Sequence, residues 1–431
     1  MRPRITTIRD IAERQLCAGC GVCAYLDPDA IRMVDDVDQG RRPLVLGDAR
    51  SRSHQDAFAA CPGRGLAHRD GLEKGAFIEE LLPAWGPVLE VYEGYAADHE
   101  IRAAGSSGGV GTALALHCLV EHGMQGVLHI AARPDIPYLN ETVFSTDRES
   151  LLAATGSRYA PASPCDRLDL IEEAAGQCVF MGKPCDVAAA AAAGTLRPRL
   201  ARNTGLTLAI FCAGAPATRG TLEMLEQMGI PPIDVRSLRY RGNGWPGKAT
   251  VRYQVGEDEA VATMSYAESW GGVLQQRRPW RCHVCADHTG EFADIAVGDP
   301  WYRPIEPDEP GRSLVLVRSE RGRRLFAAAL ASGCIVADQV APSILPQSQP
   351  NLLRTRGALW GRMLAARAIG VPVPEYRNMA TFGTWRTELT WRAKAQSVLG
   401  TVKRVLRRRL HRRLPVQPWR PASASRDGER S

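Results

Sequence analysis

Three cysteines at regular two-residue gaps constrain this chain more than any other feature. The run Cys17-Ala-Gly-Cys20-Gly-Val-Cys23 has the spacing Cys-x-x-Cys-x-x-Cys. With this spacing three thiolates can reach three irons of one cubane cluster, and the small residues between them keep the backbone close to it. The run therefore predicts an iron–sulfur site near the start of the chain.

The fourth ligand must come from elsewhere in the chain. A ferredoxin with two clusters carries a further cysteine four residues after such a run, but this chain has Asp27 there, followed by Pro28. A distant Cys-Pro pair is present at Cys61. We predict a ferredoxin-like module that has kept one of two clusters, a 4Fe–4S cluster bound by Cys17, Cys20, Cys23 and Cys61.

A zinc site, or a cysteine-rich loop without metal, is the alternative for this module. Zinc sites typically use two separated pairs of ligands rather than a triple run. The chain has twelve cysteines in 431 residues, lacks a secretory hydrophobic region in its first 14 residues, and has no apolar run long enough to span a membrane. We therefore expect a cytoplasmic protein, in which clustered cysteines indicate metal or catalysis rather than disulfides.

A second close pair, Cys282-His-Val-Cys285, is ambiguous by itself among zinc, iron–sulfur and a redox dithiol. The best further ligands are Cys185 and Cys212, because each follows a predicted parallel strand, where such sheets place ligands. His283 and His288 are possible substitutes. The remaining four cysteines are interpreted as buried structural residues: Cys118, Cys165, Cys178 and Cys334.

A glycine-rich loop, Gly105-Ser106-Ser107-Gly108-Gly109, follows a predicted strand and opens a predicted helix. Glycines allow close backbone approach, and a helix N-terminus offers free N–H groups to a phosphate. The loop fits a flavin or nucleotide phosphate, although a plain glycine-rich turn is the alternative. Lys183 is a second candidate, since a positive charge near a flavin stabilises the reduced anionic ring; the alternative for it is a surface lysine.

Strand-like and helix-like segments alternate over residues 88–335, which predicts an α/β fold with a mixed or largely parallel sheet. The expected strands cover 88–95, 126–131, 177–181, 206–211, 293–297 and 313–317, and the expected helices 109–122, 186–193 and 218–228. We divide the chain into an iron–sulfur module (1–85), a flavin- and iron–sulfur-binding core (86–340), a helical extension (341–414) and a disordered tail (415–431).

Seven ordered stretches over residues 15–330 resemble one known family, the coenzyme factor-420 hydrogenase and dehydrogenase beta subunits, with their 7-hydroxymethyl chlorophyll a reductase relatives. They are the cysteine run 17–23, the loop 105–109, Gly156-Ser157-Arg158-Tyr159, Gly182-Lys183-Pro184-Cys185, Tyr240-Arg241-Gly242-Asn243-Gly244-Trp245, the Cys282/Cys285 pair, and Ala293-Asp294-Ile295-Ala296-Val297-Gly298-Asp299. No counterpart is identified after residue 340.

The resemblance implies FAD or FMN, one or more 4Fe–4S clusters, and electron flow from a protein donor to a flavin. It favours a second cluster on Cys185, Cys212, Cys282 and Cys285. We expect an oxidoreductase that passes electrons from ferredoxin or a similar donor to FAD and on to a small organic acceptor. Tyr159, His283 and His288 are chemically able to donate a proton. The alternatives are a non-catalytic electron-transfer subunit of a larger redox complex, and a zinc-binding scaffold.

The positive charge of the chain is concentrated at its end. Twelve of the 54 Lys and Arg residues, but only two of the 47 acids, follow residue 390, so this part carries +10 and the rest −3. Apolar residues at helical spacing predict one stripe on a basic helix: Val398, Val402, Val405, Leu406 and Leu410. Such a helix can contact an anionic membrane surface or an acidic carrier protein, and nothing in it specifies nucleic acid.

Overall fold

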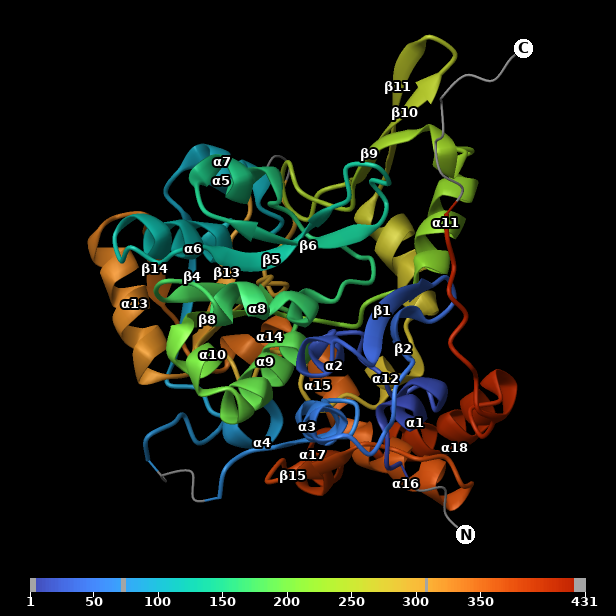
Figure 1. Ribbon diagram of the computed structural model, residues 1–431. Coiled ribbons are helices and arrows are strands. Elements are labelled where there is room, and N and C mark those ends of the chain that lie inside the picture. The colour runs from blue at the N-terminus through green and yellow to red at the C-terminus, as the bar shows by residue number, and fades with distance from the viewer. Residues whose placement is uncertain (1–4, 71–74, 307–308, 422–431) are drawn as a thin grey trace.

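A computed structural model describes residues 5–70, 75–306 and 309–421. At its centre is one eight-stranded sheet (Figure 1). Its strands, in spatial order, are β14 (Ile335–Gln339), β4 (Glu90–Ala96), β13 (Ser313–Val317), β12 (Ile295–Gly298), β8 (Thr204–Ile210), β7 (Cys178–Gly182), β5 (Val127–Ala132) and β6 (Asn140–Ser145). Strands β12, β8, β7 and β5 run parallel, and the others pair antiparallel at the two sides.

Helices cover both faces of this sheet. On one face lie α5 (His99–Ala104), α6 (Val110–Val120), α7 (Arg148–Ala153) and α13 (Glu320–Ala331); on the other lie α8 (Asp169–Glu172), α9 (Pro184–Leu196) and α10 (Pro198–Asn203). Successive residues of a strand point to opposite faces of the sheet. Val179 packs with the first group of helices and Phe180 with the second. The α/β class and the mixed sheet are therefore confirmed.

All six predicted strands and three predicted helices of the core are present, with ends shifted by a few residues. The antiparallel edge strands β6 and β14 were not predicted, because half or more of their residues are exposed or half-buried and mask the apolar signal. A separate sheet of β9 (Val235–Arg239), β10 (Ala249–Val255) and β11 (Asp258–Met264) projects beside α11 (Thr218–Gln227).

Residues 5–70 and 75–85 fold against the C-terminal helices (Figure 1). The N-terminal elements are α1 (Ile8–Glu13), α2 (Val22–Leu26), β1 (Ile31–Asp36), β2 (Gly40–Val45), α3 (Arg52–Ala60), β3 (Gly65–Ala67) and α4 (Leu82–Trp85). The C-terminal ones are α14 (Ile344–Ser348), α15 (Pro350–Gly357), α16 (Leu359–Ala368), β15 (Glu375–Arg377), α17 (Thr381–Glu388) and α18 (Trp391–Arg408). Strands β3 and β15 pair in parallel, and one apolar cluster runs from Ile8 through the sheet to Leu410.

The apolar stripe expected on α18 is buried only in part: Val405 and Leu410 are buried, whereas Val398 and Val402 are half-buried. Ser397, Thr401 and Val405 face inward toward the α16 side, whereas Leu406 is 62% exposed. Small residues on α18 let α16 and α18 approach closely. This close packing, rather than the position of the longer apolar side chains, determines which face of α18 is buried.

Residues 415–421, the described part of the segment expected to be disordered, run as extended chain beside β1. The Trp419 N–H donates to the Asp35 carbonyl at 2.7 Å, and the Gln417 N–H to the Asp36 carboxylate at 3.0 Å. Residues 422–431 lie outside the described part of the chain. Within the described residues, no helix combines the length and the apolar character needed to cross a membrane.

Candidate functional site

The four N-terminal cysteines of the predicted cluster come together in one buried place. Cys17, Cys20 and Cys23 lie on the turn into α2, and Cys61 ends α3; each is 5–8% exposed. Burial raises the pKa of Cys23 well above its usual value, and the nearby Cys61, Cys17 and Cys20 thiolates raise it further. Buried thiols that repel one another when ionised are a donor set suited to a cationic centre.

A glycine holds the turn of this run in place. Gly21 has a φ of 92°, and a Cβ atom there would lie 2.8 Å from the Asp166 backbone nitrogen. Asp27, in the position of the missing ferredoxin cysteine, is tied instead to α3: its carboxylate accepts the Ser53 hydroxyl at 2.9 Å and lies 3.4 Å from His54 Nδ1.

The second set of cysteines lines one small cavity at the carboxyl ends of β7 and β8. Cys185 lies in the first turn of α9, Cys212 follows β8, and Cys282 and Cys285 lie on and after α12 (Trp280–His283). Burial, and next the Cys282 thiolate, raise the pKa of Cys212 to about 12. The structure thus brings together the four residues that the resemblance grouped.

The two histidines offered as substitutes behave differently from each other. His288 lines the second thiol cavity, and its Nδ1–H donates to the Cys212 carbonyl at 2.9 Å. His283 is not among the residues that line it. In the described residues, no three Cys, His, Asp or Glu side chains are arranged to hold a single metal ion. A cubane cluster takes one thiolate on each iron, so its ligands need not meet at one point.

Cys165 was assigned a structural role, and the structure places it next to the first thiol group. Its backbone N–H donates to the Cys20 carbonyl at 2.9 Å, and its thiol donates to the Asp186 carbonyl at 3.2 Å. Burial and contact with the Cys20 thiol raise the pKa of Cys165 well above its usual value. Only its place in space, and not its spacing in the chain, reveals this contact.

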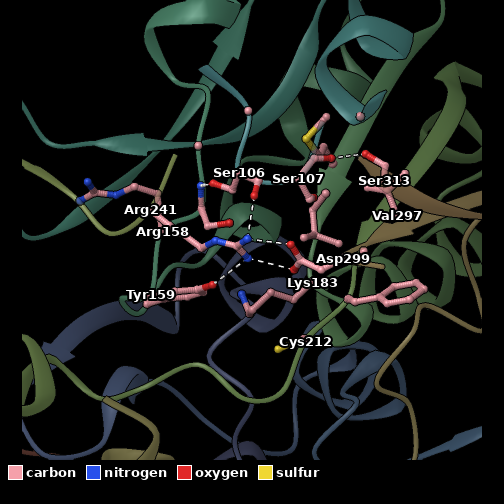
Figure 2. A pocket seen from close by; sticks show the side chains of 18 of the residues that line it. Ser106, Ser107, Arg158, Tyr159, Lys183, Cys212, Arg241, Val297, Asp299 and Ser313 are labelled. Carbon is pink, nitrogen blue, oxygen red and sulfur yellow. Dashed lines mark hydrogen bonds and ion pairs between the residues drawn. The ribbon is translucent and has the colours of Figure 1, made fainter. Parts of the chain in front are cut away.

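A cavity of about 260 Å³ opens beside the second thiol group, where β7, β8 and β12 end (Figure 2). Four of the five residues of the glycine-rich loop line it: Gly105, Ser106, Ser107 and Gly109. Gly108 does not; it has a φ of 71°, and a Cβ atom there would lie 2.7 Å from Arg312 Cα. The loop therefore needs glycine both to face the cavity and to pack on the strand behind it.

Lys183 lies in the wall between this cavity and the second thiol group, because it lines both. Its ammonium group donates to the Asp186 carboxylate at 2.6 Å. Burial alone would lower the pKa of Lys183, but the Asp186 carboxylate and the Cys185 thiolate outweigh it and raise the pKa. The lysine is thus held charged in the cavity wall, with its side chain 20% exposed.

A buried ion pair in the cavity was not predicted as part of the site. The Arg241 guanidinium donates to both oxygens of Asp299, at 2.9 and 2.7 Å, and to the Ser106 carbonyl at 2.7 Å (Figure 2). Asp299 also accepts the Trp245 indole N–H at 2.8 Å. These residues lie in stretches that carried the resemblance, which was the only signal for them. The pair fixes the glycine-rich loop against the end of β12.

Of the candidate proton donors, only Tyr159 lines the cavity. Its hydroxyl accepts a bond of 3.4 Å from Arg241, and its ring lies 4.8 Å from the Trp270 ring. Burial raises the pKa of Tyr159. Tyr159 is therefore a neutral phenol beside the Arg241–Asp299 ion pair.

The two thiol groups and the cavity form a series. Lys183 and Cys212 belong to both the cavity and the second thiol group. A third space joins Cys17 of the first group to Cys282 of the second, with Lys183 again in its wall. The second thiol group thus lies between the first group and the cavity.

Comparisons with known proteins point to one family. Residues 91–168 match the family described as coenzyme F420 hydrogenase/dehydrogenase, beta subunit, N-terminal part, and residues 176–343 match its C-terminal part. The chain is 25% identical over 322 residues to one of the subunits of the F(420)H(2) dehydrogenase of Methanosarcina mazei, covering 74% of this chain and 84% of that protein. It is also 25% identical over 259 residues to the coenzyme F420 hydrogenase subunit beta of Methanosarcina barkeri, covering 58% and 82%.

A solved structure shares the fold. A chain of the F420-reducing [NiFe] hydrogenase complex from Methanosarcina barkeri superposes with a TM-score of 0.51 at 22% identity, covering 65% of this chain and 94% of that one. The two family matches together span more than half of this chain. The protein therefore belongs to the family of coenzyme F420 hydrogenase/dehydrogenase beta subunits, and this membership identifies it as a redox protein.

Proposed function

We propose that this chain is the iron–sulfur flavoprotein subunit of a larger redox complex, which carries electrons between a partner protein and a flavin in the 260 Å³ cavity. The observation that carries the proposal is the series of two four-thiol groups ending at that cavity. Named relatives that are subunits of hydrogenases and dehydrogenases support this role over that of a free-standing enzyme.

The first 4Fe–4S cluster would be bound by Cys17, Cys20, Cys23 and Cys61, and the second by Cys185, Cys212, Cys282 and Cys285. Clusters transfer one electron at a time, and a flavin converts between one- and two-electron chemistry. Lys183 supplies the positive charge between the second thiol group and the cavity, and is the residue best placed to stabilise a reduced flavin.

The glycine-rich loop would bind the flavin phosphates. The backbone N–H groups at the start of α6 are not used by the helix itself, and Ser106 and Ser107 line the same wall. We propose FAD as the flavin. The apolar wall of β8 and β12, with Ile210 and Val297, suits the ring system.

A second candidate function is an enzyme in its own right, which takes electrons from ferredoxin or a similar donor and reduces a small organic molecule in the cytoplasm. Tyr159 in the cavity favours it, because a phenol can orient a polar substrate and donate a proton. Among organic acceptors, coenzyme F420 is the first to test, since the relatives are named for it.

Anaerobic stopped-flow mixing tests the proposed path. Reduced ferredoxin is mixed with reconstituted protein, and bleaching of the flavin absorbance is followed. Cys212→Ser should slow bleaching by at least about tenfold, because the step between the cofactors is interrupted. Cys334→Ser, in a cysteine outside both groups, is the matched control. Equal rates in the two variants would contradict the path, and a native protein that runs alone on size exclusion would favour the second candidate.

A further inference from the structure

The described C-terminal helices enclose a cavity of about 300 Å³ that is distinct from the redox site. We call it the α18 cavity; it is lined by Arg354, Thr355, Ala358, Arg362, Leu389, Ala393, Gln396, Ser397, Gly400, Thr401 and Arg404. Its walls are α15, α16 and α18, beyond residue 343, where the family match ends. Small residues leave its centre open: a Cβ atom at Gly400 would meet only Gln396 of the same helix, at 3.9 Å.

Three arginines supply the charge of this cavity, and no acid from the described part of the chain lines it. Arg362 donates one bond, of 2.9 Å, to the His283 carbonyl. The Arg404 side chain makes no hydrogen bond with any residue in the described ranges. Over residues 5–70, 75–306 and 309–421, neither Arg362 nor Arg404 has a carboxylate within 4.0 Å. Most guanidinium donors that face the cavity are therefore unused.

These cations also repel one another. Burial, and then the neighbouring charges of Arg404 and Arg278, lower the pKa of Arg362 to about 10. Burial, then Arg407 and Arg278, lower the pKa of Arg404 in the same way. Like charges held together in partly buried positions destabilise a fold unless an anion lies among them.

We propose that the α18 cavity binds a tetrahedral oxyanion of the phosphate class. Arg362 and Arg404 reach it from facing helices, and the more exposed Arg354 lies at its edge. Guanidinium groups present paired N–H donors that match phosphate oxygens, and such bonds are among the stronger ones in proteins. The bound anion would bridge α16 and α18 and, through Arg362, brace the backbone beside Cys282.

Two sources supply this chemistry: free inorganic phosphate, and the phosphate of a lipid headgroup. Exposed Trp391 and Leu399 on α18 make the second source testable, since they could enter a bilayer surface beside the cavity. The proposal concerns the anion site itself and does not depend on the redox cofactors.

Thermal unfolding of the full chain tests the site. Wild type is heated in sodium phosphate and in sodium chloride of equal ionic strength, and phosphate binding is measured by calorimetric titration. Phosphate should raise the unfolding temperature of wild type. Arg404→Gln should weaken phosphate binding at least about tenfold, since a charged hydrogen-bond donor is lost. Without phosphate this variant should unfold no earlier than wild type, because repulsion is relieved.

Arg407→Gln is the matched control, since Arg407 lies on the same helix but outside the cavity lining. It should keep the full response to phosphate. Arg362→Gln provides a second variant. In a parallel arm, vesicles of phosphatidylglycerol and of phosphatidylcholine are sedimented with each protein. Retention on the anionic vesicles alone, lost in Arg404→Gln and kept in Arg407→Gln, would identify the headgroup as the source.

The proposal is overturned if neither phosphate nor anionic vesicles bind wild type. It is also overturned if Arg404→Gln and Arg362→Gln respond as fully as Arg407→Gln, because the effect would then be a general response to salt.

Discussion

Eight of the twelve cysteines gather in two groups, and the others show how a cysteine outside them is held. Cys118 and Cys178 are fully buried against apolar neighbours on opposite faces of the sheet. Cysteines of this kind behave as small apolar residues, whereas the grouped thiols face one another and share charge repulsion. The difference lies in what each sulfur faces rather than in how deeply it is buried.

A first prediction concerns Cys61, the fourth ligand proposed for the first cluster. Cys61→Ala should remove about half of the iron from anaerobically purified protein, because one of two four-thiolate sites loses a ligand. Iron and acid-labile sulfide are measured against protein. Cys178→Ala, at a buried cysteine that belongs to neither group, should retain all of the iron. Unchanged iron in Cys61→Ala would refute the first site.

A second prediction concerns the charge of Lys183. A unit charge about 10 Å away, at an effective dielectric constant of about 20, shifts a two-electron potential by about 30 mV. Lys183→Met should therefore lower the flavin midpoint potential by about that amount, since the reduced anion loses a neighbouring positive charge. Lys183→Arg keeps the charge and should stay near wild type. A potential that is the same in all three proteins would remove the lysine from the flavin site.

Spacing and resemblance predicted most single residues of the site, but not their partners. The structure brings together the four cysteines of each group and places Lys183 in the cavity wall, because short motifs and strand ends determine local position. The contact of Cys165 with Cys20, and the ion pair of Arg241 with Asp299, were not predicted. Each joins segments 58 or more residues apart, and one sequence contains no signal for such pairs.

At the scale of elements, the sheet explains why the site forms where it does. Parallel strands β7, β8 and β12 end together, so that Lys183, Cys212 and Asp299, each just past a strand end, come to the same edge. Buried parallel strands read as unbroken apolar runs and were predicted. The edge strands β6 and β14 are partly exposed, so their residues resemble loop residues in sequence.

Strand β5 contains a buried histidine that makes stability depend on pH. Burial lowers the pKa of His129 from 6.5 to about 4, and its Nε2 lies 2.8 Å from the Ser145 hydroxyl on β6. The unfolded chain binds the proton on His129 more tightly than the folded chain does. The contribution of His129 to the free energy of unfolding is therefore fully present above about pH 6.5 and declines as the pH falls toward 4. At pH 5 the loss is about 2 kcal/mol.

Urea unfolding of wild type and His129→Gln at pH 7.5 and pH 5 measures this contribution. The difference in unfolding free energy between the two proteins should move by about 2 kcal/mol in favour of the variant at pH 5. Other titrating groups are common to both proteins and cancel. A difference that does not change with pH would mean that His129 is not buried as a neutral ring.

At the scale of the whole molecule, the described N-terminal and C-terminal segments pack together beside the first thiol group. Strand β3 pairs with β15, and Arg413 forms ion pairs with Asp10 at 2.6 Å and Glu13 at 2.8 Å. The division at residues 85 and 340 remains a prediction about domains, although one apolar cluster crosses both positions. Local composition marks linkers, but it does not report which distant segments pack together.

Removing residues 341–431 should therefore damage the N-terminal site as well as the extension. The deletion removes several buried apolar side chains and exposes the residues that pack against them. Among the side chains removed are Leu345, Leu352, Leu359 and Met363. Each contributes about 1.5–3 kcal/mol, so the sum approaches the total stability of a domain. Loss of iron and of soluble protein is expected. A stable, fully loaded 1–340 fragment would contradict the interlocked arrangement.

Chemical analysis of the protein purified without oxygen shows whether two groups of four thiols hold iron–sulfur clusters beside a flavin. Iron, acid-labile sulfide, zinc and flavin are quantified per chain in one preparation. We predict about eight irons, about eight sulfides, about one flavin and no stoichiometric zinc. Zinc at one or two ions per chain, with neither iron nor sulfide, would contradict the account.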